Sequence, residues 1–262
     1  SEDPWPFIGE DGGSAFQFSP DGTWLSFTRT VDEKRQLFLM RTSGGEAVRL
    51  SDHETSVGSY QWVEDGTHIV FVAAHKRGDE EEKEREAGGD AIFVDEGPNG
   101  QTEGEWNDLW SLEVDTKREI RLTESENRIG SFSVAPDGNS IVFTARTENR
   151  RNQGNLSEIY LLDIESREIR QLTDNRSPEG RLTWAPDGRR IAYEAPSDGE
   201  WELRLDKIWV MDIESGRKKI VSGAFDGNIR QFVWASDGSA LLFSGLQGTN
   251  NNLYRLDLIG IH

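Results

Sequence analysis

The sequence of this 262-residue chain predicts an all-β protein built from repeated four-stranded sheets. Three observations lead to this prediction. An Asp-Gly pair recurs five times between short apolar runs, a second pair of apolar strands follows most copies, and successive copies of the Asp lie 44, 72, 50 and 50 residues apart. Regular spacing of one turn motif is typical of a repeat protein, so the elements are considered repeat by repeat.

The Asp-Gly pairs are predicted to be tight turns that join the first two strands of each repeat. Alternating apolar residues such as Phe16 and Phe18 precede the pair, and a run ending in an aromatic residue such as Phe27 follows it. Asp bonds to nearby backbone, and Gly takes a positive φ without steric cost. These residues are therefore interpreted as structural, not as metal ligands, and no EF-hand calcium loop pattern occurs. They are Asp21, Gly22, Asp65, Gly66, Asp137, Gly138, Asp187, Gly188, Asp237 and Gly238.

Each repeat continues with a third strand, a turn and a fourth strand that ends in Leu-Thr or its equivalent. The clearest copy is Ile159-Tyr160-Leu161-Leu162-Asp163 followed by Glu168-Ile169-Arg170-Gln171-Leu172-Thr173. The turn between them, Glu165-Ser166-Arg167, has the polar residues that such turns prefer. Matching pairs of strands are predicted at 37–40 with 47–51, 109–113 with 119–123, and 208–212 with 218–222.

A period in the forties with four strands per repeat is the pattern of a β-propeller, in which each repeat forms one antiparallel blade. The sequence therefore predicts a single propeller domain over residues 1–262. Its repeats are expected at about 16–58, 59–130, 131–180, 181–230 and 231–262.

Strand counting leaves two possibilities for how the propeller ends. The fifth repeat contains three strands, and residues 5–9 form an apolar segment before the first repeat. That N-terminal strand would complete a fifth blade of four strands and remove the open edges of the sheet. The alternative is that the five visible repeats belong to a larger propeller.

The 72-residue spacing in the second repeat marks an insertion at about 75–106. It contains the acidic run 79–86 and a Gly-Gly pair at 88–89. Such charge runs usually form solvated loops. The functional alternative is an arm that reaches a neighbouring domain, subunit or substrate.

Composition excludes several classes of function. A formal net charge of −19 opposes binding to nucleic acid or anionic membranes. The chain has no Cys, so thiolate catalysis, disulfides and Cys-based zinc sites are excluded. No membrane-length apolar run or signal peptide is visible. We expect no cofactor, no metal and a cytoplasmic location; a periplasmic or secreted protein whose signal has been removed is the alternative.

The repeats, read as aromatic-x-aromatic-Ser/Ala-Pro-Asp-Gly and then apolar-x-Met/Leu-Asp, resemble the propeller repeats of TolB-like proteins. Together with Lys207–Asp212, Phe225-Asp226-Gly227, Asn252–Asp257 and the acidic insertion, they resemble still more closely the N-terminal propeller of the prolyl oligopeptidase family, in its acylaminoacyl-peptidase-like branch. The resemblance covers nearly the whole chain. Family propellers commonly have seven or eight blades, whereas five are visible here.

This resemblance implies a non-catalytic domain that covers an α/β-hydrolase active site and admits only short or unstructured peptides. The sequence contains no Gly-x-Ser-x-Gly nucleophile motif, and its four His residues stand in no recognisable triad. We therefore expect this chain to be catalytically inert, with a serine peptidase as its parent protein. Its expected partners are the hydrolase domain and a peptide substrate, or else a protein partner.

A smaller insertion, at 197–206, interrupts the fourth repeat. Each of the two insertions carries a Gly-Glu-Trp triplet, and these triplets supply the candidate site residues Glu105, Trp106, Glu200 and Trp201. In related exopeptidases, carboxylates of the propeller hold a peptide amine, and Arg204 could pair with a peptide carboxylate. The competing structural interpretation, which the sequence favours, is that each Trp packs its insertion onto the blade and that Arg204 forms a surface ion pair.

Three functions remain, ranked in this order. The first is a gating propeller of a serine peptidase. The second is a TolB-like scaffold that binds a protein partner. The third is a five-bladed sugar-processing enzyme, which would need paired carboxylates in a central funnel.

Overall fold

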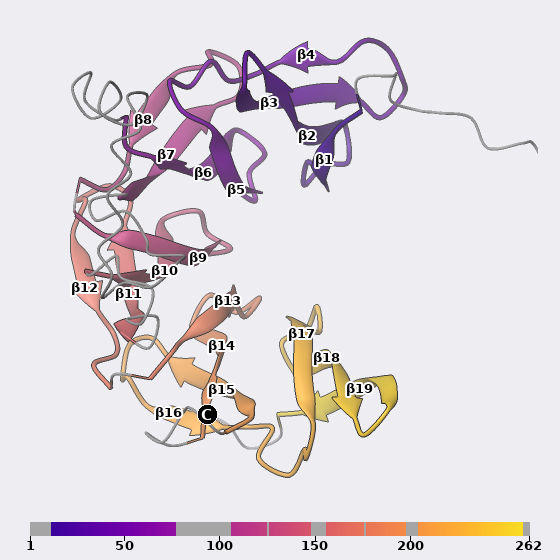
Figure 1. The fold of residues 1–262 in the computed structure, drawn as a ribbon, viewed down its shortest axis with the longest axis vertical. Coiled ribbons are helices and arrows are strands. Elements are labelled where there is room, and N and C mark those ends of the chain that lie inside the picture. Colours follow the sequence, from indigo (N-terminus) through magenta and orange to yellow (C-terminus); the bar gives the residue numbers. More distant parts are fainter. Residues whose placement is uncertain are drawn as a thin grey trace, which may run out of the picture. The chain divides into compact units, whose positions relative to one another are not determined.

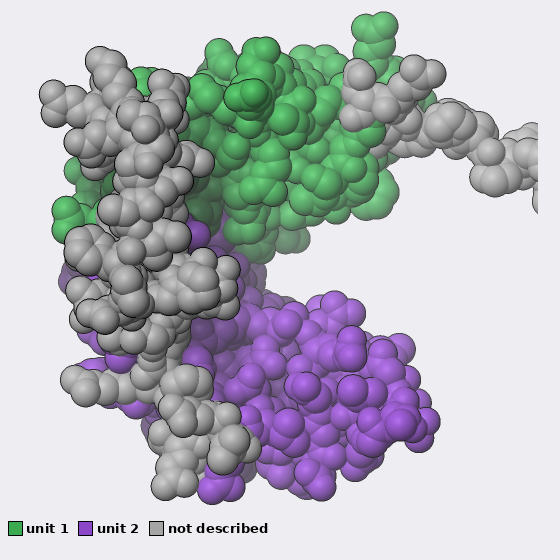
Figure 2. All heavy atoms as spheres, in the orientation of Figure 1, with its two compact units in different colours: residues 1–92, 105–126 green, residues 93–104, 127–262 purple. Residues whose placement is uncertain are grey.

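The computed structural model describes residues 12–76, 106–124, 126–147, 156–175, 177–197 and 204–258, and it confirms the all-β prediction. The described residues form nineteen strands in five antiparallel sheets and no α-helix (Figure 1). The chain divides into two compact units, Ser1–Ile92 with Glu105–Glu126 and Phe93–Gly104 with Asn127–His262, which are coloured separately in Figure 2.

The first unit contains two four-stranded sheets whose strands pair in chain order, β1-β2-β3-β4 and β5-β6-β7-β8. Buried residues of both sheets, such as Leu37 and Phe71, share one apolar cluster. The strands are β1 (Ser14–Phe18), β2 (Trp24–Val31), β3 (Lys34–Arg41), β4 (Val48–Arg49), β5 (Val57–Trp62), β6 (His68–Ala74), β7 (Asn107–Glu113) and β8 (Glu119–Arg121).

The second unit contains two four-stranded sheets, β9 to β12 and β13 to β16, and the three-stranded sheet β17-β18-β19 predicted for the fifth repeat. The strands are β9 (Arg128–Val134), β10 (Ser140–Arg146), β11 (Glu158–Asp163), β12 (Ile169–Gln171), β13 (Gly180–Trp184), β14 (Arg190–Pro196), β15 (Asp206–Asp212), β16 (Lys218–Ile220), β17 (Asn228–Trp234), β18 (Ala240–Gln247) and β19 (Asn250–Asp257).

All five Asp-Gly pairs form the predicted turn between the first two strands of a sheet. Each Gly has a φ between 65° and 74°, and its N–H donates to the carbonyl three residues earlier. Each Asp carboxylate accepts the backbone N–H two residues later, at 2.8 to 3.0 Å. At Asp21, hydrogen bonds from Ser19 and Thr23 lower the carboxyl pKa to about 2. These ten residues therefore all lie in tight turns.

Each sheet also carries one aromatic pair between its second and third strands. Two aromatic residues face each other directly across the strands, with ring centroids 5.0 to 6.4 Å apart and planes inclined by 15° to 22°. Such stacked pairs add to the free energy of burial and hold the register of neighbouring strands. The pairs are Phe27 with Phe38, Phe71 with Trp110, Phe143 with Tyr160, Tyr193 with Trp209, and Phe243 with Tyr254.

The Leu-Thr motif at the end of the fourth strand acts as a hydrogen-bonded clasp. In four sheets the Ser or Thr hydroxyl accepts a backbone N–H of the third strand, at 2.7 to 3.0 Å, where the ladder with the fourth strand ends. The clasp pairs are Leu37 with Ser51, Leu109 with Thr123, Ile159 with Thr173, and Ile208 with Ser222. A buried backbone donor is thereby satisfied without a longer strand.

Two sequence predictions fall outside the described residues. The strand expected at residues 5–9 is one, so closure of the propeller and its number of blades stay predictions. Most of the insertion at 75–106 is the other. Its two ends are described, and they are joined by a hydrogen bond of 2.9 Å from the His75 N–H to the Trp106 carbonyl. The insertion therefore leaves the sheet between β6 and β7.

Candidate functional site

The described residues include two of the five predicted site residues. Trp106 is half-buried directly before β7, at the base of the insertion, and Arg204 is exposed before β15. Glu105, Glu200 and Trp201 lie outside the described residues. Trp106 belongs to the first unit and Arg204 to the second, so each is considered within its own unit.

A polar pocket lies on the second sheet beside the base of the insertion. Its volume is about 480 Å³, which is within the usual range for small-molecule sites. β7 and β8 supply half-buried and buried side chains, and the connection between β4 and β5 and the end of β6 supply the rest. The pocket is lined by Asp52, His53, Glu54, Thr55, Ala74, His75, Lys76, Asp108, Trp110, Glu119 and Arg121.

Asp108 is the buried centre of this pocket, with a side chain only 1% exposed. Its Oδ1 accepts the Thr123 hydroxyl of the clasp at 2.8 Å. Its Oδ2 accepts Arg121 Nε at 2.7 Å and Nη2 at 2.5 Å, and His75 Nε2 lies 2.5 Å from the same oxygen. A carboxylate this deeply buried needs such partners, because an unpaired buried charge is strongly destabilising.

A second His–carboxylate pair forms the adjoining wall. His53 is buried, and its Nδ1 lies 2.6 Å from Glu119 Oε2. The imidazole packs edge-on against the indole of Trp110, with centroids 4.7 Å apart, and against Phe71 at 5.2 Å. The ring of His53 is therefore held from three sides.

The other charges around the pocket are also paired. Asp52 lies 2.5 Å from Arg49, and Glu54 lies 3.5 Å from Lys76. Arg121 differs, because its Nη1 donates no hydrogen bond to any residue that the structure describes. The pocket thus presents one held guanidinium with a remaining donor beside the half-buried indole of Trp110.

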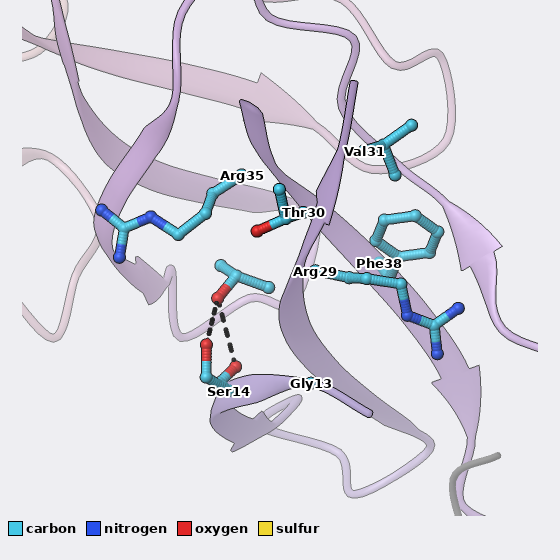
Figure 3. A pocket seen from close by; sticks show the side chains of 8 residues that line it. Gly13, Ser14, Arg29, Thr30, Val31, Arg35 and Phe38 are labelled. Atoms are coloured by element: carbon cyan, nitrogen blue, oxygen red, sulfur yellow. Dashed lines mark hydrogen bonds between the residues drawn. The ribbon is translucent and has the colours of Figure 1, made fainter. Parts of the chain in front are cut away.

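A second pocket of the first unit lies on the first sheet, as Figure 3 shows. Its volume is about 680 Å³, and Arg29 and Arg35 line it without any carboxylate. Arg29 is engaged, since its Nε donates to the Gly12 carbonyl and its guanidinium stacks over Phe38 at 5.1 Å. The two guanidinium groups point to opposite sides of the pocket (Figure 3), so they do not converge on one ligand position. The pocket on the second sheet is therefore the preferred candidate.

The second unit contains a buried carboxyl pair, Glu158 and Glu179, near Tyr193. Burial raises the pKa of Glu179 to about 7, and the charge of Glu158 adds to the effect. Burial likewise raises the pKa of the Tyr193 phenol.

Among the described residues, no three His, Cys, Asp or Glu side chains gather to hold a metal ion. No described helix is long and apolar enough to cross a membrane.

Sequence analysis missed the pocket on the second sheet. One signal in the sequence could have indicated this pocket. It is the acidic residue Asp108 at the start of an apolar strand, directly before Leu109. The preceding strand ends at Ala74, next to His75, and β8 ends at Arg121. Only the pairing of β7 with both neighbouring strands brings these residues together, and that pairing spans the insertion.

Comparison with known proteins places this chain among propeller proteins. No family model matches it. The curated peptidase YuxL of Bacillus subtilis, itself uncharacterised, is 28% identical over 148 residues, which are 53% of this chain and 22% of that protein. The acylaminoacyl peptidase of Pyrococcus horikoshii has a TM-score of 0.66 at 19% identity, over 95% of this chain and 37% of that chain.

Two other propeller proteins are similar to a comparable degree. TolB of Acinetobacter baumannii has a TM-score of 0.62 at 17% identity, covering 95% of this chain and 53% of that one. An oligogalacturonate lyase of Vibrio parahaemolyticus has a TM-score of 0.64 at 16% identity, covering 92% of this chain and 61% of that one. This chain spans less than two thirds of each of these proteins. The resemblance to TolB-like and acylaminoacyl-peptidase-like propellers is confirmed at the level of the fold.

Proposed function

We propose that this chain is the non-catalytic propeller domain of a serine peptidase and that it restricts access to a separate α/β-hydrolase domain. The observation that carries the proposal is the joint similarity to two peptidases. The sequence similarity to YuxL and the structural similarity to an acylaminoacyl peptidase both involve a minor part of a longer protein. A Gly-x-Ser-x-Gly motif is absent from the sequence.

The proposed substrate contacts are Glu105, Trp106, Glu200, Trp201 and Arg204. The carboxylates would hold a peptide amine, and Arg204 would pair with a peptide carboxylate. The proposal includes a cytoplasmic location, with a periplasmic or secreted protein whose signal has been removed as the alternative. These assignments follow the resemblance and the position of the insertions.

The TolB-like scaffold is the second candidate. The structural similarity to TolB favours it to a similar degree, and a scaffold would need no hydrolase domain. The similarity to an oligogalacturonate lyase keeps a sugar-processing enzyme as a third, weaker candidate. Fold alone does not discriminate among these functions.

Sequencing the gene beyond residue 262 separates the candidates. A downstream Gly-x-Ser-x-Gly with a later Asp and His supports the peptidase, whereas a stop codon and an upstream signal peptide support the scaffold. We expect this chain alone to leave acyl-amino-acid nitroanilides uncleaved. Turnover that survives purification and serine-directed inhibitors would contradict the inert-domain proposal.

Restriction of access is tested on the parent protein. The rate of peptide cleavage should fall steeply as the peptide is lengthened while the residues at the cleaved bond are kept. The variants Trp106→Ala and Arg204→Ala should raise KM for peptides more than for a nitroanilide. Equal rates for short peptides and for unfolded protein chains would count against gating.

A further inference from the structure

The side chain of Arg121 is held differently from its counterparts in the first and third sheets. In strand pairing, Arg121 lies opposite Trp110, as Arg49 lies opposite Phe38 and Gln171 opposite Tyr160. The side chains of Arg49 and Gln171 both turn back to the carbonyl of the clasp residue two positions later, at 2.8 and 2.7 Å. Arg121 instead reaches across to Asp108.

A carboxylate at the position of Asp108 is not needed to complete the clasp. In the first sheet the equivalent residue is Gln36, which is fully buried and accepts the clasp hydroxyl of Ser51 at 2.6 Å. A neutral amide therefore completes the same clasp. The carboxylate at position 108 does something that Gln36 does not, because it holds Arg121 and His75 at the pocket wall.

A guanidinium positioned by a buried carboxylate is a good receptor for an anion. Its geometry is set before the ligand arrives, so little side-chain entropy is lost on binding. The Nη1 donor remains for a ligand, and the side chain is 35% exposed. The acidic residues around it already have cationic or imidazole partners.

We propose that Arg121 binds the carboxylate of a small ligand in the pocket on the second sheet and that the apolar part of this ligand packs against Trp110. The indole and the guanidinium are cross-strand neighbours, so one ligand reaches both. The pocket volume of about 480 Å³ accommodates a group of the size of a phenylalanine side chain. Asp108 is a positioning residue in this arrangement. The proposal is independent of the peptidase function.

The test titrates the full chain with 3-phenylpropionate and with its neutral amide, and follows the indole N–H resonance of Trp110, assigned with Trp110→Phe. A second pair of probes, N-acetyl-Gly-Phe and its C-terminal amide, distinguishes a peptide terminus from a small free acid. An acid that binds should have a Kd at least tenfold lower than that of its amide. This factor corresponds to a difference of ~1.4 kcal/mol in the free energy of binding. Equal affinity for acid and amide, or no shift with either acid at millimolar concentration, would overturn the proposal.

Variants locate the anion contact. Arg121→Gln should weaken binding of the acid at least tenfold. The matched control, Arg118→Gln, removes the same charge from an exposed position of the same hairpin and should change the affinity less than twofold. Asp108→Asn keeps an acceptor for Thr123 and should weaken binding by an intermediate factor, since it loosens Arg121.

Arg121→Gln leaves the buried carboxylate of Asp108 without its guanidinium partner and therefore destabilises the sheet. The double variant Asp108→Asn/Arg121→Gln removes both charges, so it should fold, as judged by its thermal transition, and fail to bind. Unchanged affinity for the acid in either folded variant would show that Arg121 is not the receptor.

Discussion

The carboxyl group of Glu179 accepts a hydrogen bond from the hydroxyl of Thr173 at 2.5 Å, and both side chains are buried. Asn175 donates to the other carboxyl oxygen at 2.8 Å. Glu179 lies five residues before Trp184, the last residue of β13. The residues at the equivalent position in the second, third and fifth sheets are apolar and buried in the core, namely Val57, Ile129 and Ile229. An ionisable group thus stands in an apolar position of the repeat.

Glu179 should make this protein less stable as the pH rises from about 4.5 to about 7. Its pKa is about 7 in the folded chain, against an ordinary value of 4.5. Between these values the folded state binds more protons than the unfolded state, so the free energy of unfolding falls with rising pH. The full difference corresponds to ~3 kcal/mol. Denaturant unfolding at pH 4.5 and at pH 8 measures it.

The variant Glu179→Gln isolates this contribution from other groups that titrate in the same interval. Gln keeps the shape and one acceptor but no proton equilibrium, so the fall in stability between the two pH values should shrink by about 2 to 3 kcal/mol. The exposed Glu165→Gln is the matched control and should keep the wild-type dependence. If Glu179→Gln also keeps the wild-type pH dependence, Glu179 is not the group whose proton uptake stabilises the folded chain.

Local features of the fold could be predicted from the sequence, whereas the polar contacts could not. The turn at Asp187 and Gly188 depends on adjacent residues, so the motif alone predicts it. The contacts of Glu179 and Asp108 depend on which side chains the strand register brings near them. Sequence showed Glu179 only as one of 48 acidic residues. The register that joins Asp108 to Arg121 is fixed by pairing of strands that sequence placed only approximately.

Gly188→Ala should destabilise the protein by about 1 kcal/mol, measured by denaturant unfolding. Gly188 has a φ of +65°, and a Cβ in this region clashes with its own backbone. No atom outside Gly188 and its two chain neighbours lies within 4 Å of the added Cβ, so the cost comes from the local backbone alone. Gly180→Ala is the control, because Gly180 has equal space around it but no positive φ. Equal losses in both variants would contradict the backbone explanation.

Ser222→Ala tests the clasp at the end of the fourth strand. The Ser222 hydroxyl accepts the backbone N–H of Ile208 at 2.8 Å, and both residues are buried. Removing it leaves a buried donor unsatisfied, which should cost about 1 to 3 kcal/mol. Hydrogen exchange of the Ile208 amide should accelerate as well. The exposed Ser236→Ala should stay within about 0.5 kcal/mol of wild type.

Trp184→Phe should weaken the junction between the sheets β9 to β12 and β13 to β16. The indole Nε1 of Trp184 donates to the Ser133 carbonyl at 3.0 Å in a buried position. Phe fills most of the space but leaves that carbonyl without its donor, so we expect a loss of about 1 to 3 kcal/mol in the free energy of unfolding. Trp234→Phe is the comparison, because its indole donates to the Thr183 carbonyl at 3.3 Å in a half-buried position. Water can replace this second donor, so the loss from Trp184→Phe should be the larger one, and the reverse order would show that burial of the carbonyl does not set the cost.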